Sequence, residues 1–501
     1  MRGDTSPRHF SSVQKAGLFL GPLLFMLLIH LPAFPPLSEK AQVVLAVMLW
    51  MLIWWISEAV QLSVTALLPI ILFPMTGVLD LDQTTGAYGN KIIFLFMGGF
   101  MIALALEKWQ LHLRIALSIV RLTGTNADGI IFGFMLATGA LSMWISNTAT
   151  AVMMLPIASS VITLLVKENS EYTPRQLANF SLCMMLGIAY AASIGGIATL
   201  VGTPPNTVLV SIIEDRYGYN ISFADWAAVG FPFSLMMLFL MYWVLVKIVY
   251  PNRMGHFKGS EELIQKELNK LGKLSKGERL TLMIFTGTAL LWILHSYLEI
   301  IFPWLVLDDT IIAIVGTIAL FICPVDFNKG EFVLRWEDTQ RLPWGILLLF
   351  GGGLALANAL DEVGLVRLIG EAVAQNNNLG FFTINVILIT LSLFLTEIMS
   401  NVALVTIIIP LVAGISVSLG ENPLWACIPV TMAASCAFML PMSTPPNAIV
   451  FASGHITVAQ MAKAGFILNL ISIIILVLMT QFWIPFIFEI VPGVMPEWGV
   501  K

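Results

Sequence analysis

The chain has 501 residues, of which 58% are hydrophobic and 11% charged, and its formal net charge is −5. An ordinary soluble domain carries about 25% charged residues, so this composition excludes a water-soluble globular protein and a disordered chain. The nearly balanced charge is not typical of a nucleic-acid-binding protein, and no nucleic-acid partner is expected. Apolar runs of about 17 to 30 residues without alternation predict membrane helices rather than a membrane β-barrel.

The apolar runs predict two series of helices separated by one long polar stretch. The first series is expected at about 16–34, 41–74, 91–107, 130–165, 177–213 and 226–250. The second series is expected at about 280–302, 309–323, 344–360, 383–419, 424–455 and 463–490. The run 41–74 is either one tilted helix or two pieces broken near Glu58 to Ser63. Together they predict an all-α polytopic membrane protein with about eleven transmembrane helices.

The positive charges predict which ends lie in the cytoplasm. The polar stretch 251–279 is rich in Lys and Arg, and the N-terminus carries Arg2, Arg8 and Lys15. Basic segments stay on the cytoplasmic side, so both are expected there, with the C-terminus outside the cell. We therefore expect a plasma-membrane protein with an N-terminal repeat half 1–250, a cytoplasmic linker 251–279 and a C-terminal repeat half 280–501.

Two of the apolar runs are too long for a single span, and each is split by a polar tripeptide. The run 130–165 contains Ser146-Asn147-Thr148, and the run 383–419 contains Ser400-Asn401-Val402. The arms on either side are shorter than a hydrocarbon core of about 30 Å requires. They predict two re-entrant helical hairpins with polar tips near mid-membrane, which is tolerable only where a tip faces protein or a wet cavity.

An ordered set of markers indicates an internal duplication. Each hairpin is preceded by a glycine pair and followed, in the next apolar run, by the same tetrapeptide. These tetrapeptides are Thr203-Pro204-Pro205-Asn206 and Thr444-Pro445-Pro446-Asn447, and they predict broken helices at about 177–213 and 424–455. If each half holds an odd number of crossings, the repeat is inverted. Transporters with inverted repeats bind substrate at the repeat interface, where helices are interrupted.

The interruptions have the chemistry of an anion site beside a cation site. Thr203 and Thr444 can cap new helices with proline at the first position, and helix N-termini attract carboxylates. The side-chain oxygens of Ser142, Ser146, Asn147, Thr396 and Asn401, with free backbone carbonyls, could bind a hard monovalent cation. No Lys, Arg or His lies at either tip, so bound Na⁺ would compensate the anion. The competing interpretation is that these polar residues only join neighbouring helices.

Two acidic residues in apolar surroundings need their own interpretation. Glu58 lies inside an apolar run beside Trp54 and Trp55, and it is either functional or a headgroup-level or structural residue. Glu397 adjoins the second tip, where it could tune the site or merely cap a helix.

These motifs resemble the divalent anion/sodium symporter family, the carriers of succinate, related dicarboxylates and citrate. The resemblance is carried by Ser142 to Thr150, by Thr396 to Asn401 and by Ser443 to Asn447. It implies an inverted-repeat homodimer in membrane lipid, with a scaffold and an elevator-type transport domain. It implies one Na⁺ at Ser142, Ser146, Asn147 and the region of Gly195, and a second at Thr396, Met399, Asn401 and Ser443. It implies substrate carboxylates at Ser146, Asn147, Thr148, Ser400, Asn401 and Val402, flanked by Thr203, Thr444 and Pro445.

The expected function is sodium-coupled symport of C4 dicarboxylates such as succinate, malate and fumarate, or of related di- or tricarboxylates, without covalent chemistry. Val402 stands where some family members carry Thr, which leaves the preferred substrate open. A sodium-independent dicarboxylate exchanger and a carrier of sulfate-type oxyanions are the alternatives. A membrane enzyme is the weakest alternative, because the sequence offers no nucleophile–base pair, metal-ligand cluster or phosphate-binding loop at membrane depth.

Overall fold

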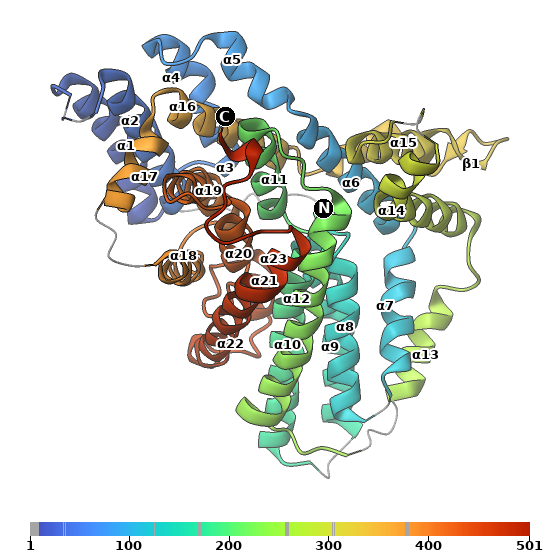
Figure 1. The fold of residues 1–501 in the computed structure, drawn as a ribbon. Helices are drawn as coiled ribbons and strands as arrows, with labels where there is room; N and C mark the ends of the chain where they lie inside the picture. The colour runs from blue at the N-terminus through green and yellow to red at the C-terminus, as the bar shows by residue number, and fades with distance from the viewer. Residues whose placement is uncertain are drawn as a thin grey trace.

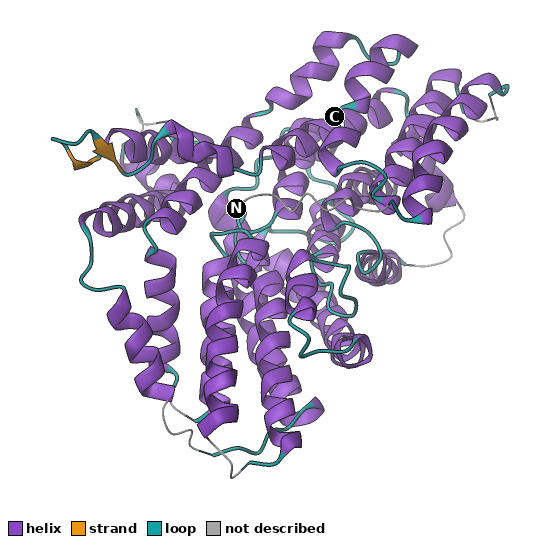
Figure 2. Ribbon diagram, turned by 180° about the vertical axis from the view of Figure 1, so that it is seen from behind, coloured by secondary structure: helices purple, strands orange, loops and turns teal. Residues whose placement is uncertain are grey.

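The computed structural model describes residues 10–33, 35, 37–124, 126–168, 172–255, 260–302, 304, 306–375 and 380–500. Arg2 and Arg8, on which the predicted orientation partly depends, lie outside these ranges, as does Phe34 at the expected end of the first helix. Helices dominate the described chain (Figures 1 and 2). Within it, the only strands are β1 (Pro324–Asp326) and β2 (Glu331–Phe332), which form a small antiparallel hairpin.

The first part of the chain contains one interrupted segment and then a long helix. The interruption resolves the alternatives for 41–74, because the backbone of Glu58 turns left-handed (φ 48°) and ends α2. Trp55 Nε1 donates a 3.2 Å hydrogen bond across the gap to the carbonyl of Leu62. The elements are α1 (Ser12–His30), α2 (Glu39–Ser57), α3 (Leu62–Thr65), α4 (Leu68–Thr76), α5 (Leu81–Gly86), η1 (Ala87–Gly89) and α6 (Lys91–Lys108).

The two hairpins and the two broken helices follow the predicted pattern. The first hairpin is α8 (Ala127–Ser142) with α9 (Asn147–Glu168), and its counterpart is α18 (Phe381–Leu395) with α19 (Asn401–Ser418). The broken helices are α10 (Pro174–Ile197) with α11 (Pro204–Tyr217), and α20 (Leu424–Ala434) with α21 (Pro445–Ala452). The expected fold class, an all-α membrane protein with an inverted repeat, two hairpins and two broken helices, is confirmed.

The remaining segments complete the two series. Among the described residues, ten helices are long and apolar enough to cross a membrane. Five shorter apolar helices accompany them, and three of these, α8, α18 and α20, are short because each ends at a hairpin tip or a break. The other elements are α12 (Phe223–Trp243), η2 (Val244–Val249), α14 (Lys276–Ile301), α15 (Asp309–Ile322), η3 (Trp336–Arg341), α16 (Trp344–Glu362), α22 (Val458–Leu478), η4 (Met479–Trp483), α23 (Ile484–Ile487) and η5 (Glu497–Val500).

Three described helices of more than ten residues lie outside the predicted apolar runs. The amphipathic helices α7 (Leu111–Leu122) and α17 (Leu365–Gln375) occupy matching places in the two halves, each between a long helix and a hairpin. Polar residues recur along them, so they contain no apolar run of membrane length. The helix α13 (Ser260–Lys270) lies within the polar stretch 251–279 and packs against α7. Lys258, one of the basic residues of that stretch, lies outside the described ranges.

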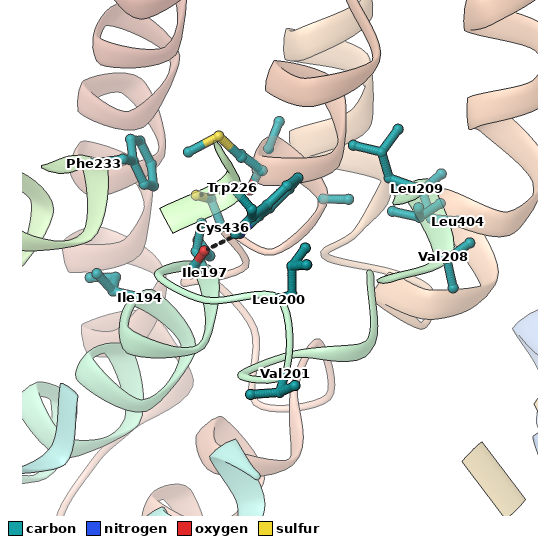
Figure 3. Packing of buried hydrophobic residues seen from close by; sticks show 14 of the residues in the cluster. Ile194, Ile197, Leu200, Val201, Val208, Leu209, Trp226, Phe233, Leu404 and Cys436 are labelled. Carbon is teal, nitrogen blue, oxygen red and sulfur yellow. Dashed lines mark hydrogen bonds between the residues drawn. The ribbon is translucent and has the colours of Figure 1, made fainter. Parts of the chain in front are cut away.

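The helix α10 is the buried centre of the first half. It packs against α8, α9, α12 and α21, and its side chains from Phe180 to Ile197 are buried. Breaking it leaves carbonyls in its last turn without helical partners. The indole Nε1 of Trp226 donates a 2.9 Å hydrogen bond to the Ile197 carbonyl (Figure 3), and Ser234 Oγ donates one of 2.7 Å to that of Ile194. Side chains of α12 therefore supply hydrogen bonds to two carbonyl groups near the break at the end of α10.

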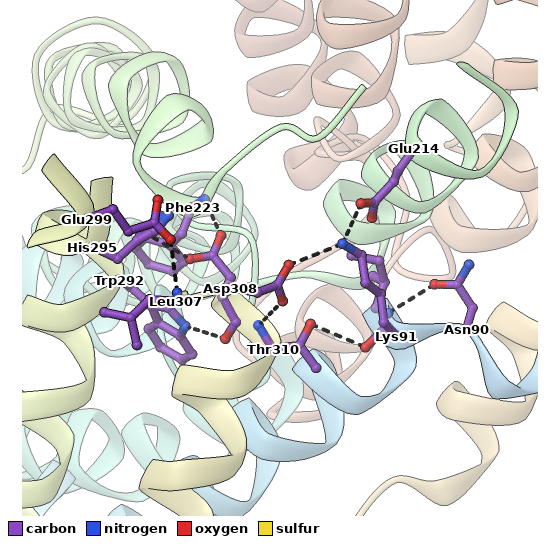
Figure 4. A network of polar contacts seen from close by, with 12 residues as sticks. Asn90, Lys91, Glu214, Phe223, Trp292, His295, Glu299, Leu307, Asp308 and Thr310 are labelled. Atoms are coloured by element: carbon purple, nitrogen blue, oxygen red, sulfur yellow. Dashed lines mark hydrogen bonds and ion pairs between the residues drawn. The ribbon is translucent and has the colours of Figure 1, made fainter. Parts of the chain in front are cut away.

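Ion pairs tie the end of α11 to its neighbours. Lys91, at the start of α6, lies 2.5 Å from Glu214 and 3.1 Å from Asp308 (Figure 4). Arg216 lies 2.5 Å from Asp361 at the end of α16. Burial alone would raise the pKa of Asp308, but hydrogen bonds from the Thr310 N–H and Lys91 outweigh it and hold that pKa below its usual value. These contacts position the second piece of the first broken helix.

The glycine-rich segments of α6 and α16 allow close helix packing. A Cβ on Gly98 would lie 3.0 Å from the carbonyl oxygen of Ala313. One on Gly352 would lie 2.2 Å from the carbonyl oxygen of Ala66. Because these neighbours are backbone atoms, they cannot move aside cheaply.

We therefore expect Gly352→Ala to destabilise the protein by about 1–3 kcal/mol, the usual cost of overpacking. Gly287→Ala in α14 is the matched control, because a Cβ there meets nothing within 4 Å. The measurement is the thermal unfolding midpoint of both variants in the same detergent. Equal midpoints would show that the contact between α16 and α3 is not tight.

Candidate binding site at two helix breaks

The first hairpin tip brings together three oxygen atoms. Ser142 ends α8 and Asn147 begins α9, while Ser146 Oγ accepts a 3.2 Å hydrogen bond from the Ala149 N–H. The hydroxyl of Ser142 lies 2.7 Å from Asn147 Oδ1 and 2.7 Å from the carbonyl oxygen of Ala192 in α10. A hydroxyl has one proton, so it can donate to only one of these acceptors at a time. The group is rich in lone pairs, as a hard cation requires.

The second tip repeats the arrangement with different residues. Thr396 Oγ1 lies 2.7 Å from Asn401 Oδ1 and 2.6 Å from the carbonyl oxygen of Ala434, the last residue of α20. Thr396 and Asn401 are five residues apart, as are Ser142 and Asn147. Each tip is thus joined to the broken helix of its own half through one buried hydroxyl.

The last residue of each tetrapeptide holds the unwound chain in place. Asn206 Nδ2 donates to the carbonyls of Thr199 (2.8 Å) and Gly196 (3.1 Å), seven and ten residues earlier. Asn447 Nδ2 donates to the carbonyls of Leu440 and Ala437, both at 3.1 Å and at the same spacings. The amide oxygens of both asparagines are buried and have no hydrogen-bond partner among the described residues. From the sequence, both asparagines were expected only as repeat markers, although their identical places in the two tetrapeptides were a signal for this role.

The expected helix caps are present in part. Thr203 and Thr444 both have extended backbones and stand at the N-cap with proline next. Thr444 Oγ1 accepts a 3.4 Å hydrogen bond from the Asn447 N–H, whereas Thr203 makes no side-chain cap. Ser400 likewise makes none, unlike Ser146. Thr203 therefore occupies the expected cap position without a capping hydroxyl bond, and Asn206 organises the first break instead.

Burial separates the predicted residues into two groups. Those expected to contact Na⁺ alone are buried, whereas most of those expected to contact substrate, including the three expected to contact both, are at least partly exposed. The buried ones are Ser142, Gly195, Thr396, Met399 and Ser443, together with the flanking Thr203 and Thr444. The partly or fully exposed ones are Ser146, Asn147, Thr148, Ser400, Asn401, Val402 and Pro445.

Backbone contact explains why glycine occupies position 195. A Cβ on Gly195 would lie 2.2 Å from the carbonyl oxygen of Gly139, and one on Gly196 would lie 2.5 Å from Asn147 Oδ1. The hairpin and the broken helix therefore touch through their main chains. The second pieces of the broken helices also cross between halves, because α21 packs against α9 and α11 packs against α19. The two tips and the two breaks thus belong to one packed assembly.

Glu397 is a buried carboxylate with an unusual set of partners, and only 3% of its surface is exposed. Its Oε1 accepts hydrogen bonds from the N–H groups of Phe438 and Met439, both 2.9 Å, and from Asn469 Nδ2, 2.8 Å. Its Oε2 accepts one from the Leu440 N–H at 3.1 Å. Glu397 therefore binds the unwound chain between α20 and α21 and not the N-terminus of a described helix. Glu58, in contrast, lies at the end of α2, where its carbonyl accepts from Gln14 Nε2.

Interrupted helices that meet hairpin tips inside a polytopic helical protein define the class of secondary membrane transporters. The sequence profile of the family described as the sodium:sulfate symporter transmembrane region matches residues 14–490. The chain belongs to this family, which confirms the resemblance stated from the motifs.

Relatives and solved structures extend this result. The chain is 41% identical over 486 residues to the sodium-dependent dicarboxylate transporter SdcS of Staphylococcus saprophyticus, covering 95% of this chain and 93% of that one. It is 42% identical over 490 residues to SdcS of Staphylococcus aureus, covering 96% and 94%. The fold is similar to that of the Alcanivorax borkumensis YdaH transporter (TM-score 0.52, 13% identity, 95% and 97% covered) and of Neisseria gonorrhoeae MtrF (0.55, 13%, 95% and 100%).

We expect Asn147→Ala or Asn401→Ala to abolish transport while most of the protein stays folded. Each change removes an amide oxygen from a tip cluster but leaves the helix that follows the tip intact. Uptake into proteoliposomes and the yield of monodisperse protein measure the two effects, with the exposed Asn328→Ala as the control. Normal transport by both tip variants would show that the site is elsewhere.

Proposed function

We propose that this protein is a secondary active transporter that couples Na⁺ to the uptake of C4 dicarboxylates or related di- or tricarboxylates. The observation that carries the proposal is the matched pair of oxygen clusters, Ser142–Asn147–Ala192 and Thr396–Asn401–Ala434. Its support from relatives is the name of the SdcS proteins, sodium-dependent dicarboxylate transporters about as long as this chain.

In this proposal, each cluster contributes to one Na⁺ site. Hydroxyl, amide and carbonyl oxygens suit a hard cation, and the described residues contain no group of three or more His, Cys, Asp or Glu side chains that could hold a transition metal. Ser142, Ser146 and Asn147, with the backbone near Gly195, would hold one ion. Thr396 and Asn401, with the backbones of Met399 and Ser443, would hold the other.

The substrate carboxylates would bind where the helix N-termini meet the more exposed tip residues. The N-termini of α9, α11, α19 and α21 all begin at a tip or a break, so their free N–H groups and dipoles favour anions. Ser146-Asn147-Thr148 and Ser400-Asn401-Val402 would supply polar contacts, with Thr203, Thr444 and Pro445 beside them. Val402 contributes no hydroxyl, which favours a substrate with fewer polar groups near that tip.

Transport would follow an elevator-type movement in a homodimer, with the hairpins and broken helices moving as a unit. The repeat halves would be 1–250 and 280–501, joined by the cytoplasmic linker 251–279, with the C-terminus outside the cell. The ion pairs from Lys91 to Glu214 and from Arg216 to Asp361 connect α11 to α6 and α16. They would have to exchange partners during such a movement.

Two other carriers remain as alternatives in this proposal. The family description names sulfate, which keeps a sulfate-type oxyanion carrier as the second candidate. A sodium-independent dicarboxylate exchanger is the third. The SdcS names favour dicarboxylate and sodium over both.

Uptake of labelled succinate into proteoliposomes separates the three candidates. We expect uptake to fall to background when choline replaces Na⁺, because the anion site has no fixed cation. Excess malate should compete with succinate, and excess sulfate should not. Undiminished uptake in choline would support the exchanger, and strong competition by sulfate would support the oxyanion carrier.

Removing the hydroxyl of the second cluster tests the sodium site separately. We expect Thr396→Val to raise the Na⁺ concentration for half-maximal uptake by about 10-fold, because the loss of one ligand oxygen typically costs about 1.4 kcal/mol or more. Thr390→Val is the matched control in α18, the helix that ends just before Thr396, since the Thr390 hydroxyl only donates to the carbonyl of Val386 one turn earlier. An equal Na⁺ dependence of the two variants would remove Thr396 from the site.

A further inference from the structure

We propose that Glu397 makes the two proposed sodium sites unequal, acting as a positioning residue whose fixed negative charge favours Na⁺ at the second site. The inference rests on the proposed sodium sites at the two tips and concerns a residue that is not itself a ligand there. It begins from a difference between the two halves at corresponding positions.

Both halves connect the hairpin tip to the unwound chain directly after the cluster hydroxyl. In the first half Met143 follows Ser142, and its carbonyl accepts a 2.5 Å hydrogen bond from Thr199 Oγ1. In the second half Glu397 follows Thr396, and its side chain binds the N–H groups of Phe438 to Leu440. Thr199 and Leu440 are themselves equivalent, because each lies seven residues before the asparagine of its tetrapeptide. The connection is therefore neutral in one half and ionic in the other.

The partners of Glu397 match a carboxylate rather than a carboxylic acid. All four hydrogen-bond partners are donors, three from the backbone and one from the Asn469 amide, and they serve both oxygens. A protonated acid would direct its own proton at one of these N–H groups. No Lys, Arg or His of the described chain pairs with Glu397. The negative charge is thus buried and stabilised by hydrogen-bond donors alone, without a described counter-ion.

A buried charge without a counter-ion is costly, and a cation nearby reduces the cost. Glu397 is bonded in sequence to Thr396, whose hydroxyl belongs to the second oxygen cluster. Through Phe438 it also holds the chain that leaves Ala434, whose carbonyl completes that cluster. The carboxylate therefore fixes the geometry of the second cluster and lowers the free energy of a cation there. At the first cluster, the hydrogen bond between Thr199 and Met143 fixes only the geometry and adds no charge.

Glu397→Gln, Glu397→Asp and Asn469→Ala separate charge from geometry. Gln removes the charge at nearly constant shape, Asp keeps the charge with a shorter reach, and Asn469→Ala removes one donor but leaves the carboxylate. Glu421→Gln is the control, because Glu421 also accepts a backbone N–H, from Gly493, but in a partly exposed loop outside the site. The readouts are the Na⁺ dependence of succinate uptake and the rise in thermal midpoint that Na⁺ causes without succinate.

We expect Glu397→Gln to raise the half-saturating Na⁺ concentration by about 10-fold or more and to reduce the Na⁺-induced thermal shift, as loss of one nearby charge requires. At saturating Na⁺ its half-saturating succinate concentration should stay within about 3-fold of the wild type, since the charge acts on the cation. Glu397→Asp and Asn469→Ala should keep a Na⁺ dependence within about 3-fold of wild type, even where maximal uptake falls.

An unchanged Na⁺ dependence in folded Glu397→Gln would overturn the proposal and leave Glu397 a purely structural residue. If Glu397→Gln does not fold, Glu397→Asp decides, because loss of its Na⁺-induced thermal shift would contradict a role for the charge. A wild-type protein that shows neither Na⁺-dependent uptake nor a Na⁺-induced shift would instead contradict the proposed function. The two failures are therefore distinguishable.

Discussion

The constraint on which this structure depends is that a backbone interrupted inside a membrane must find its hydrogen bonds within the protein. Here two helices are broken and two hairpins turn around in the interior, so many N–H and carbonyl groups lose helical partners. Asn206 and Asn447 bind the carbonyls of the two breaks, while Trp226 binds one more at the end of α10. Each break is thereby rigid enough to present the oxygens that remain free.

The repeat preserves this geometry while changing its chemistry. The hydroxyl that joins tip and broken helix is Ser142 in one half and Thr396 in the other, with nearly the same distances to an amide and a carbonyl oxygen. The next residue differs more, because Met143 offers only its carbonyl and Glu397 offers a carboxylate. Duplication supplies two equivalent backbone arrangements, and a substitution beside each cluster can then alter one proposed cation site without disturbing the other.

The sequence predicts much of this fold because helix length and helix-breaking residues are local properties. The polar tripeptides locate both tips, and Thr203-Pro204-Pro205 and its counterpart locate both breaks. The amphipathic helices α7 and α17 are not predicted, because they lack an apolar run of membrane length. The role of Asn206 is not predicted, and that of Glu397 is left open, for another reason. These side chains bind carbonyl or N–H groups that lack helical partners only where the backbone unwinds. Sequence spacing does not locate the unwound residues to within one position.

Electrostatics explains why such a site would be coupled rather than a simple anion pocket. Four helix N-termini attract a dicarboxylate, but each carries only about half a positive charge, and that partial charge is effective only within the first turn. Glu397 adds a negative charge to the same region, which opposes the anion further. An anion would therefore bind weakly to the empty protein and strongly once cations occupy the clusters. Since linkage is reciprocal, the anion would hold the cations equally firmly. Because the tips lack Lys and Arg, binding of the anion in the proposed carrier depends on bound Na⁺. The sodium gradient can therefore drive uptake of the anion.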